Sequence, residues 1–343
     1  MPANDISQLP TGVLIDRWGR PVTGVRISLN SSERCNYRCI FCHSEGIYDD
    51  PEDLMTPKEI ERIVRILYKF GVMTVKLTGG EPMLRKDIVE IVRRIKSIGV
   101  KEVSMTTNGT RFALLAKDLK NAGLDRVNIS VHSLRRDTYK FITGVDRFDE
   151  MRNAIDAALE NQIVPLKLNV VIMRGVNENE ITDLIDFTSK LNERGETVLQ
   201  LIELVAEGFA ANSPFFKKYY YSLSEIERTI AKQAIKVEKR QLHNRMKYYL
   251  PNGAILEFVK PMYNSEFCMG NNRIRITYDG KFKPCLLRQD NHVDFITVMR
   301  NGATDEELEE IFKKAVRMRE PFFKPGIGPT TTPPSRIFYT CTE

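Results

Sequence analysis

The stretch Cys35-Asn36-Tyr37-Arg38-Cys39-Ile40-Phe41-Cys42 places three cysteines close together in the chain. Thiolates at this C-x3-C-x2-C spacing can bind three corners of an iron–sulfur cube, and one iron then has no protein ligand. Four-cysteine patterns saturate their cluster for electron transfer, whereas an open iron can chelate a small molecule. The stretch therefore predicts a reaction centre.

Two other kinds of site fit part of this pattern. A C-x2-C pair is often half of a structural zinc site, but such a site needs four Cys or His ligands, commonly from a second C-x2-C. The sequence has no second C-x2-C, and His43 adjoins Cys42 so closely that it can seldom turn back onto the same metal. Buried or redox-active thiols are the remaining alternative. The spacing favours the open iron–sulfur site.

The composition is that of an ordinary globular protein. With 343 residues, 42% hydrophobic and 28% charged, the chain can form one large α/β domain plus an extension. It contains no apolar run near the roughly 20 residues of a membrane span. Because residues 1–10 lack a basic region and an apolar region, we expect no export signal and a cytoplasmic protein. Six cysteines in a reducing compartment indicate metal binding rather than disulfides.

The charge pattern bears on the partners. The formal net charge is +6, and basic runs such as 62–69 alternate with acids at helical spacing. This pattern is typical of a solvated helix face and argues against a nucleic-acid footprint. A basic balance also suits an anionic small substrate.

Short β-branched runs alternate with amphipathic helical stretches between residues 22 and 205, which is the pattern of βα units around a parallel sheet. The first intervening helix has a clear start, with Thr56 as N-cap, Pro57 at the first helical position and Glu59 completing a capping box. Six strands are predicted: Val22–Leu29, Met73–Thr78, Glu102–Thr106, Arg126–Val131, Leu166–Met173 and Val198–Val205.

Several of these strands carry polar residues at alternate positions, where a strand covered on both faces should be apolar. An unpaired buried cation costs several kcal/mol, so this face must line a wet or ligand-filled cavity. The pattern therefore predicts a parallel barrel with a polar interior. The residues concerned are Arg26, Ser28, Lys76, Thr78, Asn128, Ser130, His132, Lys167 and Asn169.

Active sites of parallel barrels gather at the carboxyl ends of the strands. The second predicted strand ends in Thr78-Gly79-Gly80-Glu81-Pro82, and the third ends in Thr106-Thr107-Asn108-Gly109. Taken alone, the Gly-Gly-Glu-Pro run is more often a tight turn before a helix. Glycines in such a turn would allow the backbone to approach a ligand closely.

The rhythm of strands and helices breaks after Val205. An aromatic, lysine-rich stretch, 215–221, and a helical segment, 222–234, suggest a second region, and Tyr278-Asp279-Gly280-Lys281 is typical of a hairpin turn. The predicted organisation is an N-terminal segment 1–21, a barrel 22–212, a carboxyl-terminal region 213–320 and a tail 321–343.

The C-x3-C-x2-C motif with Phe41 before its last cysteine resembles the signature of the radical S-adenosylmethionine (SAM) enzymes. The resemblance implies a partial (β/α)6 barrel of the TIM type, and a 4Fe–4S cluster on Cys35, Cys39 and Cys42. It also implies that SAM chelates the open iron and is cleaved reductively to give a 5′-deoxyadenosyl radical, a chemistry that belongs to the cofactor. By the same resemblance the SAM contacts are Phe41, Gly79, Gly80, Asn108, Ser130 and Val205.

The segment 267–285 resembles the carboxyl-terminal signature of the GTP 3′,8-cyclase family of molybdenum cofactor biosynthesis, whose motif is C-x2-C-N-R-x-R followed by a final Pro-Cys. The resemblance implies a second 4Fe–4S cluster that binds guanine. Cys268 and Cys285 keep the family spacing, but Asn271 replaces the middle cysteine. Cys341, in the tail, is a hypothetical replacement ligand, and an unpaired terminal cysteine is the alternative. The family's terminal Gly-Gly pair is absent.

The resemblance also implies a substrate site. Arg273 and Arg275 are the expected catalytic residues, which bind the substrate and help to reduce the cyclised intermediate, although a solvated hairpin face would also explain them. Two departures concern the SAM pocket: Val205 replaces a frequent methionine, and His132 replaces an aspartate. His132 suits either a hydrogen-bonded wall or an acid–base role. The expected GTP contacts are Arg26, Lys76, Thr106, Lys167, Arg273, Ile274 and Arg275.

The two resemblances together imply the activity of the GTP 3′,8-cyclase family, with SAM and two 4Fe–4S clusters as cofactors. The resemblance implies an electron donor such as flavodoxin or ferredoxin, a downstream cyclic pyranopterin monophosphate synthase, and a monomer or homodimer without membrane attachment. Two alternatives stay open. One is a radical SAM enzyme that modifies a peptide, and the other is a non-catalytic iron–sulfur sensor of nucleotides.

Overall fold

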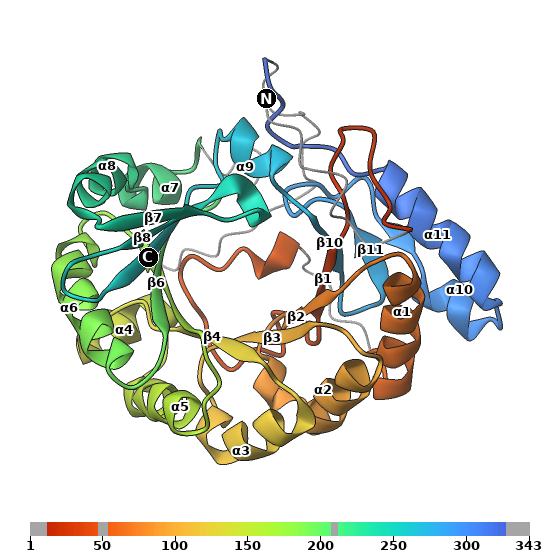
Figure 1. Cartoon of the computed structure of the whole chain (residues 1–343), viewed down its shortest axis with the longest axis horizontal. Helices are drawn as coiled ribbons and strands as arrows, with labels where there is room; N and C mark the ends of the chain where they lie inside the picture. Colours follow the sequence, from red (N-terminus) through yellow and green to blue (C-terminus); the bar gives the residue numbers. More distant parts are fainter. Residues whose placement is uncertain (1–11, 47–53, 207–211, 327–343) are drawn as a thin grey trace.

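The computed structural model describes residues 12–46, 54–206 and 212–326. Its centre is a ring of strands with helices outside it, and the loop after the first strand lies within the ring (Figure 1). The first half of the chain supplies β1 Gly24–Ser28, α1 Pro57–Lys69, β2 Thr74–Thr78, α2 Ile88–Ser97, β3 Glu102–Thr107, α3 Phe112–Ala122, β4 Arg126–Ser130, α4 Arg136–Thr143, α5 Phe148–Glu160, β5 Leu166–Ile172, α6 Ile181–Asn192 and β6 Thr197–Glu203.

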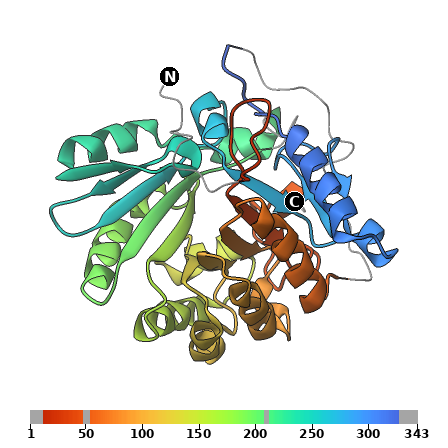
Figure 2. The same ribbon diagram turned by 45° about the vertical axis from the view of Figure 1, so that its right-hand side comes forward.

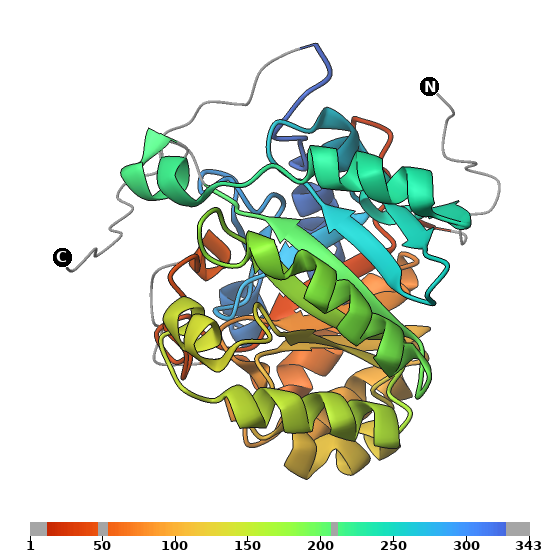
Figure 3. The same cartoon turned by 90° about the vertical axis from the view of Figure 1, so that its left-hand side faces the viewer.

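The six predicted strands are confirmed, each within a few residues of its predicted bounds, and they pair in parallel in chain order. The capping box of α1 is also confirmed, because Thr56 and Glu59 each accept a hydrogen bond from the other's backbone N–H. The outer faces of the strands carry buried aliphatic residues such as Val25, Ile27 and Leu77. Helices α5 and α6, in yellow-green, cover the outer face of β4, β5 and β6 (Figure 3).

The second half of the chain extends the same sheet at both ends. It supplies α7 Pro214–Tyr219, α8 Ser224–Gln233, β7 Lys236–Lys239, β8 Met246–Tyr249, β9 Ile255–Val259, α9 Ser265–Met269, β10 Arg273–Ile276, β11 Lys281–Lys283, β12 Val293–Asp294, α10 Ile296–Arg300 and α11 Asp305–Arg317. Short 3-10 turns are η2 Ser44–Gly46, η3 Pro82–Leu84, η4 Glu178–Glu180 and η6 Leu242–Asn244.

Strand β9 pairs in parallel with β6, and β10 pairs in parallel with β1, so the sheet order is β12-β11-β10-β1-β2-β3-β4-β5-β6-β9-β8-β7. The predicted hairpin turn at residues 278–281 is confirmed, since β10 and β11 pair antiparallel. Helix α11 lies beside α1 (Figure 2), where Arg62 pairs with Asp305 at 2.9 Å. The division at residue 212 stays a prediction, and strands from both sides of it share one sheet.

No helix in the described part of the chain combines the length and the apolarity needed to cross a membrane.

Candidate functional site

A cavity of about 1180 Å³ occupies the interior of the barrel. The polar positions predicted from strand alternation all line it, namely Arg26, Ser28, Lys76, Thr78, Asn128, Ser130, His132, Lys167 and Asn169. Its wall also includes the predicted SAM contacts Phe41, Gly79, Gly80, Asn108 and Val205, together with Thr106, Arg273 and Arg275. The five described cysteines, Cys35, Cys39, Cys42, Cys268 and Cys285, line it as well.

The three cysteines of the loop after β1 form one group. The backbone N–H of Cys42 donates to the carbonyl of Cys39 at 3.0 Å, and the N–H of Ser44 points at the Cys42 sulfur at 3.4 Å. Burial raises the pKa of the Cys35 thiol to about 11, so metal binding here displaces protons. Three thiols in one loop facing a cavity fit a 4Fe–4S cluster with one open iron.

The Gly-Gly-Glu turn after β2 packs tightly against the loop after β1. A Cβ added to Gly80 would lie 2.0 Å from the Ser31 carbonyl oxygen, and Gly79 has a φ of +118°. The buried Glu81 carboxylate accepts bonds from the N–H of Asn108 and the hydroxyl of Thr107, both at 2.7 Å. Burial raises the pKa of Glu81 to about 7. This turn therefore joins the carboxyl ends of β2 and β3. Because Gly79 and Gly80 have no side chains, their backbone forms part of the cavity wall.

His132 is a wall residue of the cavity. Its ring packs edge-on against Phe41, with centroids 4.8 Å apart, and its Nδ1 accepts a bond from the Val171 N–H at 3.2 Å. Burial lowers the pKa of His132 to about 3. Because Nδ1 is an acceptor and the ring is neutral, the geometry supports the wall interpretation of His132 over an acid–base role.

Basic side chains lie next to one another around the inner face of the barrel. Arg275 on β10 is the register partner of Arg26 on β1, and Arg26 is the register partner of Lys76 on β2. Lys76 pairs in turn with Ser104, and Ser104 with Arg126 on β4. Like charges at neighbouring positions on one face destabilise a sheet. The sheet itself gains nothing from this arrangement, which needs negative charge nearby to balance it.

Three carboxylates pair with six of the arginine and lysine residues that line the cavity. Glu45 pairs with Arg26 and Arg275, Glu102 with Arg126, and Glu257 with Lys167, Arg240 and Arg245. Within the described residues, Lys76 and Arg273 form no ion pair. The side chain of Arg273 lies above Gly24, and burial together with Arg126 lowers its pKa to about 9.

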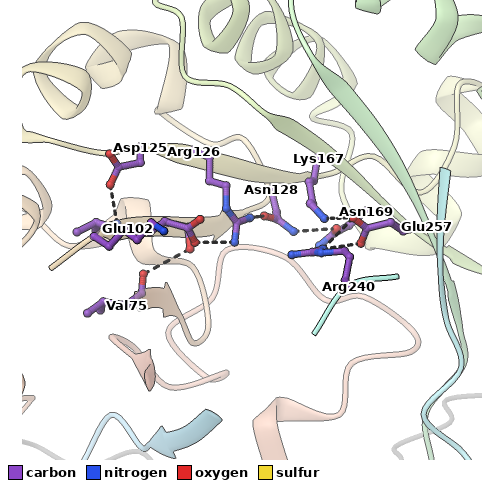
Figure 4. Close-up of polar contacts among 12 residues, drawn as sticks. Val75, Glu102, Asp125, Arg126, Asn128, Lys167, Asn169, Arg240 and Glu257 are labelled. Carbon is purple, nitrogen blue, oxygen red and sulfur yellow. Dashed lines mark hydrogen bonds and ion pairs between the residues drawn. The ribbon is translucent and has the colours of Figure 1, made fainter. Parts of the chain in front are cut away.

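Figure 4 shows how polar side chains of β3, β4, β5 and β9 connect. Arg126 binds Glu102 at 2.7 Å and Asn128 at 3.1 Å, and Asn128 donates to Asn169 at 3.2 Å. Nearby, Glu257 accepts bonds from Lys167 at 2.6 Å and from Arg240 at 2.8 Å. These contacts hold the basic side chains in fixed positions before any ligand is present.

Several of these residues were missed by sequence reasoning. Arg240 and Arg245 belong to the connection between β7 and β8, and Glu257 to β9, so no local signal linked them to the barrel interior. Arg126 and Glu102 are the first residues of their strands, and their polarity is typical of strand ends. Glu45 follows the cysteine motif closely enough to have been considered.

The side chain of one predicted substrate contact, Ile274, does not face the cavity, and a contact through its main chain stays a prediction. Ile274 is fully buried in the hydrophobic core and is not among the residues that line the cavity. Alternation along β10 explains this, since Arg273 and Arg275 point into the barrel and the residue between them must point outward.

The second cysteine pair lies against both ends of the described chain. Cys268 and Cys285 line the cavity beside Asn271. Asn271 is occupied by structural bonds: its side-chain oxygen accepts from the Arg273 N–H at 3.0 Å, and its carbonyl accepts from Arg319 at 2.6 Å. Asn271 is therefore poorly suited to replace a thiolate. Cys341 lies outside the described residues.

A buried ion cluster contacts the segment that carries Cys268 and Asn271. Asp16 pairs with Arg20 at 2.9 Å and with Arg319 at 3.2 Å, and the side chains of all three are almost completely buried. Arg20 also donates to the carbonyl of Cys268 at 2.9 Å. The two thiols, Cys268 and Cys285, line the cavity and fit part of a cluster site that requires a further ligand.

Two family models match the chain: "Radical SAM superfamily" over residues 29–188 and "Molybdenum Cofactor Synthesis C" over residues 197–325. A protein of Thermococcus kodakarensis named "Probable GTP 3',8-cyclase" is 50% identical over 315 residues, which are 91% of this chain and 100% of the relative. The chain belongs to the GTP 3′,8-cyclase family of radical SAM proteins. A relative of the same name from Pyrococcus abyssi is also 50% identical, over 91% of this chain and its own full length.

Solved structures share the fold of this family member at low sequence identity. "Native anSMEcpe with bound AdoMet" has a TM-score of 0.58 at 17% identity and covers 85% of this chain and 81% of its own. The structure of "Streptococcus suis SuiB bound to precursor peptide SuiA" has a TM-score of 0.57 at 19% identity and covers 89% of this chain and 67% of its own. These likenesses confirm the predicted radical SAM fold.

Proposed function

We propose that this chain is a radical SAM GTP 3′,8-cyclase, which converts GTP to (8S)-3′,8-cyclo-7,8-dihydroguanosine 5′-triphosphate as the first step of molybdenum cofactor biosynthesis. The family membership supports the class of reaction. The single observation that supports the substrate is the pair of unpaired cations, Lys76 and Arg273, among the basic side chains of the cavity. A polyphosphate brings the negative charge that this cavity lacks.

The cysteine loop would hold the first cluster through Cys35, Cys39 and Cys42. When bound, the reduced cluster and SAM supply the radical that removes hydrogen from the ribose. The chain's own part is to bind, orient and exclude water, since the Gly79–Glu81 turn presents backbone and the Phe41–His132 pair closes the wall. We place SAM against Phe41, Gly79, Gly80, Asn108, Ser130 and Val205.

The basic face of the barrel would hold GTP. Arg275, Arg26 and Lys76 are register partners on neighbouring strands, so their charges form a row that suits a chain of phosphates. We assign the triphosphate and ribose to Arg26, Lys76, Thr106 and Lys167. Arg273 and Arg275 would contact the substrate and donate to the cyclised product while it is being reduced. These assignments rest on cavity position and charge.

Guanine would bind at the second cluster, beside Cys268 and Cys285. The described residues offer two thiols there, and the structural bonds of Asn271 leave the third place to another part of the chain. We propose Cys341 for this place. A reductant such as flavodoxin or ferredoxin, a downstream cyclic pyranopterin monophosphate synthase, a cytoplasmic location and a monomeric or homodimeric state complete the proposal.

The test is an anaerobic reaction of the protein reconstituted with iron and sulfide, given SAM, a strong reductant and GTP, and analysed by mass spectrometry. A GTP-derived isomer of unchanged mass together with 5′-deoxyadenosine is the expected result. Intact GTP together with 5′-deoxyadenosine would contradict the cyclase and favour a peptide substrate, and no SAM turnover would favour a sensor. The Cys35→Ala variant should form neither product.

A further inference from the structure

Glu45 connects the cysteine loop to the basic face of the barrel. It lies in η2, three positions after Cys42, and its side chain is only 13% exposed. Its φ of 55° is unusual for a residue other than glycine, so contacts must hold it there. The contacts that the structure shows are ion pairs to two arginines.

The Glu45 carboxylate binds Arg26 through one oxygen at 2.5 Å and Arg275 through the other at 2.6 Å. These arginines are register partners on β1 and β10. Burial by itself raises the pKa of Glu45, but the two guanidinium groups lower it to about 2. A permanent anion therefore lies between two cations that would otherwise repel each other.

The Glu45 carboxylate leaves some of the buried polar groups beside it without a partner. The buried Nε of Arg26 has no hydrogen-bond partner. The next cation along the face, Lys76, is 6% exposed and forms no ion pair with any described residue. An incoming polyanion could accept a hydrogen bond from the Arg26 Nε and pair with the ammonium of Lys76.

We propose that Glu45 is an internal counter-anion of the Arg26–Arg275 pair, which the polyphosphate of the substrate displaces. The inference rests on the proposed placement of a polyphosphate in the barrel. Because Glu45 and Cys42 share one short loop, with Ser44 donating to the Cys42 sulfur, displacement of the carboxylate changes the support of that loop. Substrate binding is thereby transmitted to the SAM cluster.

The test compares Glu45→Gln, which keeps the shape and removes the charge, with wild type. The matched control is Glu193→Gln, which removes a carboxylate from the outer surface. Calorimetry measures the binding of inorganic tripolyphosphate to each reconstituted protein. We expect Glu45→Gln to bind about tenfold more tightly, because the competing anion is gone, and the control to match wild type. Equal or weaker binding by Glu45→Gln would overturn the proposal.

Displacement itself is measured by hydrogen exchange of a peptide that spans residues 42–46. Tripolyphosphate should increase exchange in wild type and have no effect in Glu45→Gln, and unchanged exchange in wild type with ligand bound would also overturn the proposal. Equal iron per chain establishes that the variant folds. Tripolyphosphate contains neither guanine nor ribose, and its binding requires no SAM. The binding and exchange measurements therefore test the role of Glu45 even if the protein fails the cyclase assay.

Discussion

Gly24 and Arg273 are register partners on the parallel strands β1 and β10, and the glycine leaves the space through which the arginine side chain enters the barrel. A Cβ at residue 24 would lie 3.1 Å from Cγ of Arg273 and 2.5 Å from the hydroxyl of Thr74. The position of an unpaired cation in the cavity thus depends on the absence of a methyl group on the neighbouring strand.

Gly24→Ala should therefore move Arg273 and lower kcat/KM for GTP by about tenfold, with both clusters still assembled. Steady-state kinetics and iron analysis check this expectation. If the effect acts through the arginine, Gly24→Ala adds little in an Arg273→Ala background. Fully additive losses in the double variant would show that the methyl group acts elsewhere.

Lys76→Met should stabilise the unliganded protein by about 1 kcal/mol and weaken GTP binding. Burial and four neighbouring cations lower the pKa of Lys76 well below its usual value, so the charged ammonium costs free energy in the empty barrel. Thermal unfolding without nucleotide and the KM for GTP measure the two effects. A lower melting temperature together with an unchanged KM would contradict the role of Lys76.

Arg275→Ala should reduce cyclised product and leave cluster assembly and SAM cleavage in place. The arginine lies on the inner face of β10 and is not a proposed cluster ligand, and Glu45 keeps its second partner, Arg26, in the variant. Product and 5′-deoxyadenosine are quantified in the same reaction. Full product formation by the variant counts against the assignment.

Stability should fall in acid as Glu102 is protonated. Burial raises its pKa, but the hydrogen bond and the charge of Arg126 outweigh burial and lower the pKa to about 2 from an unfolded value of 4.5. A lowered folded pKa stabilises the protein above the unfolded pKa, and this contribution is lost as pH falls from 4.5 towards 2. Glu102→Gln should cost about 2 kcal/mol at neutral pH, and urea unfolding should show this cost shrinking below pH 4.5. A cost independent of pH would contradict this account.

Cys341→Ala tests the missing ligand of the second site. If Cys341 replaces the family cysteine, iron per chain falls towards the content of one cluster, and SAM cleavage persists because the first cysteine group is unchanged. Iron analysis and electron paramagnetic resonance of the reduced protein measure this. Unchanged iron and activity would identify an ordinary terminal cysteine, and Cys268→Ala provides the reference for loss of the cluster.

Strand alternation was sufficient to predict the barrel interior. Lys76 and Lys167 could be assigned to a cavity because a cation that points inward from a covered strand would be unstable in an apolar core. The same rule would have excluded the side chain of Ile274, whose assignment came from resemblance and ignored the period of two along β10. Local periodicity was the more reliable guide wherever it applied.

Long-range pairing could not be predicted in the same way. Nothing near β9 or β10 indicates that they would join β6 and β1, because parallel partners distant in sequence carry no local signal. Arg240, Arg245 and Glu257 enter the cavity region only through this pairing. The left-handed backbone of Glu45, which aims its carboxylate at two strands, is likewise a product of tertiary contacts.

The buried cluster of Asp16, Arg20 and Arg319 sets an order for biosynthesis. The first cysteine group is complete once residue 42 has been made. The carbonyl of Cys268, in contrast, binds Arg20, which shares a buried ion cluster with Asp16 and Arg319, two residues that are 303 positions apart in the chain. A nascent chain therefore presents iron ligands for the first site long before the second can close. During synthesis the proposed guanine site beside Cys268 would therefore be completed after the first cysteine group.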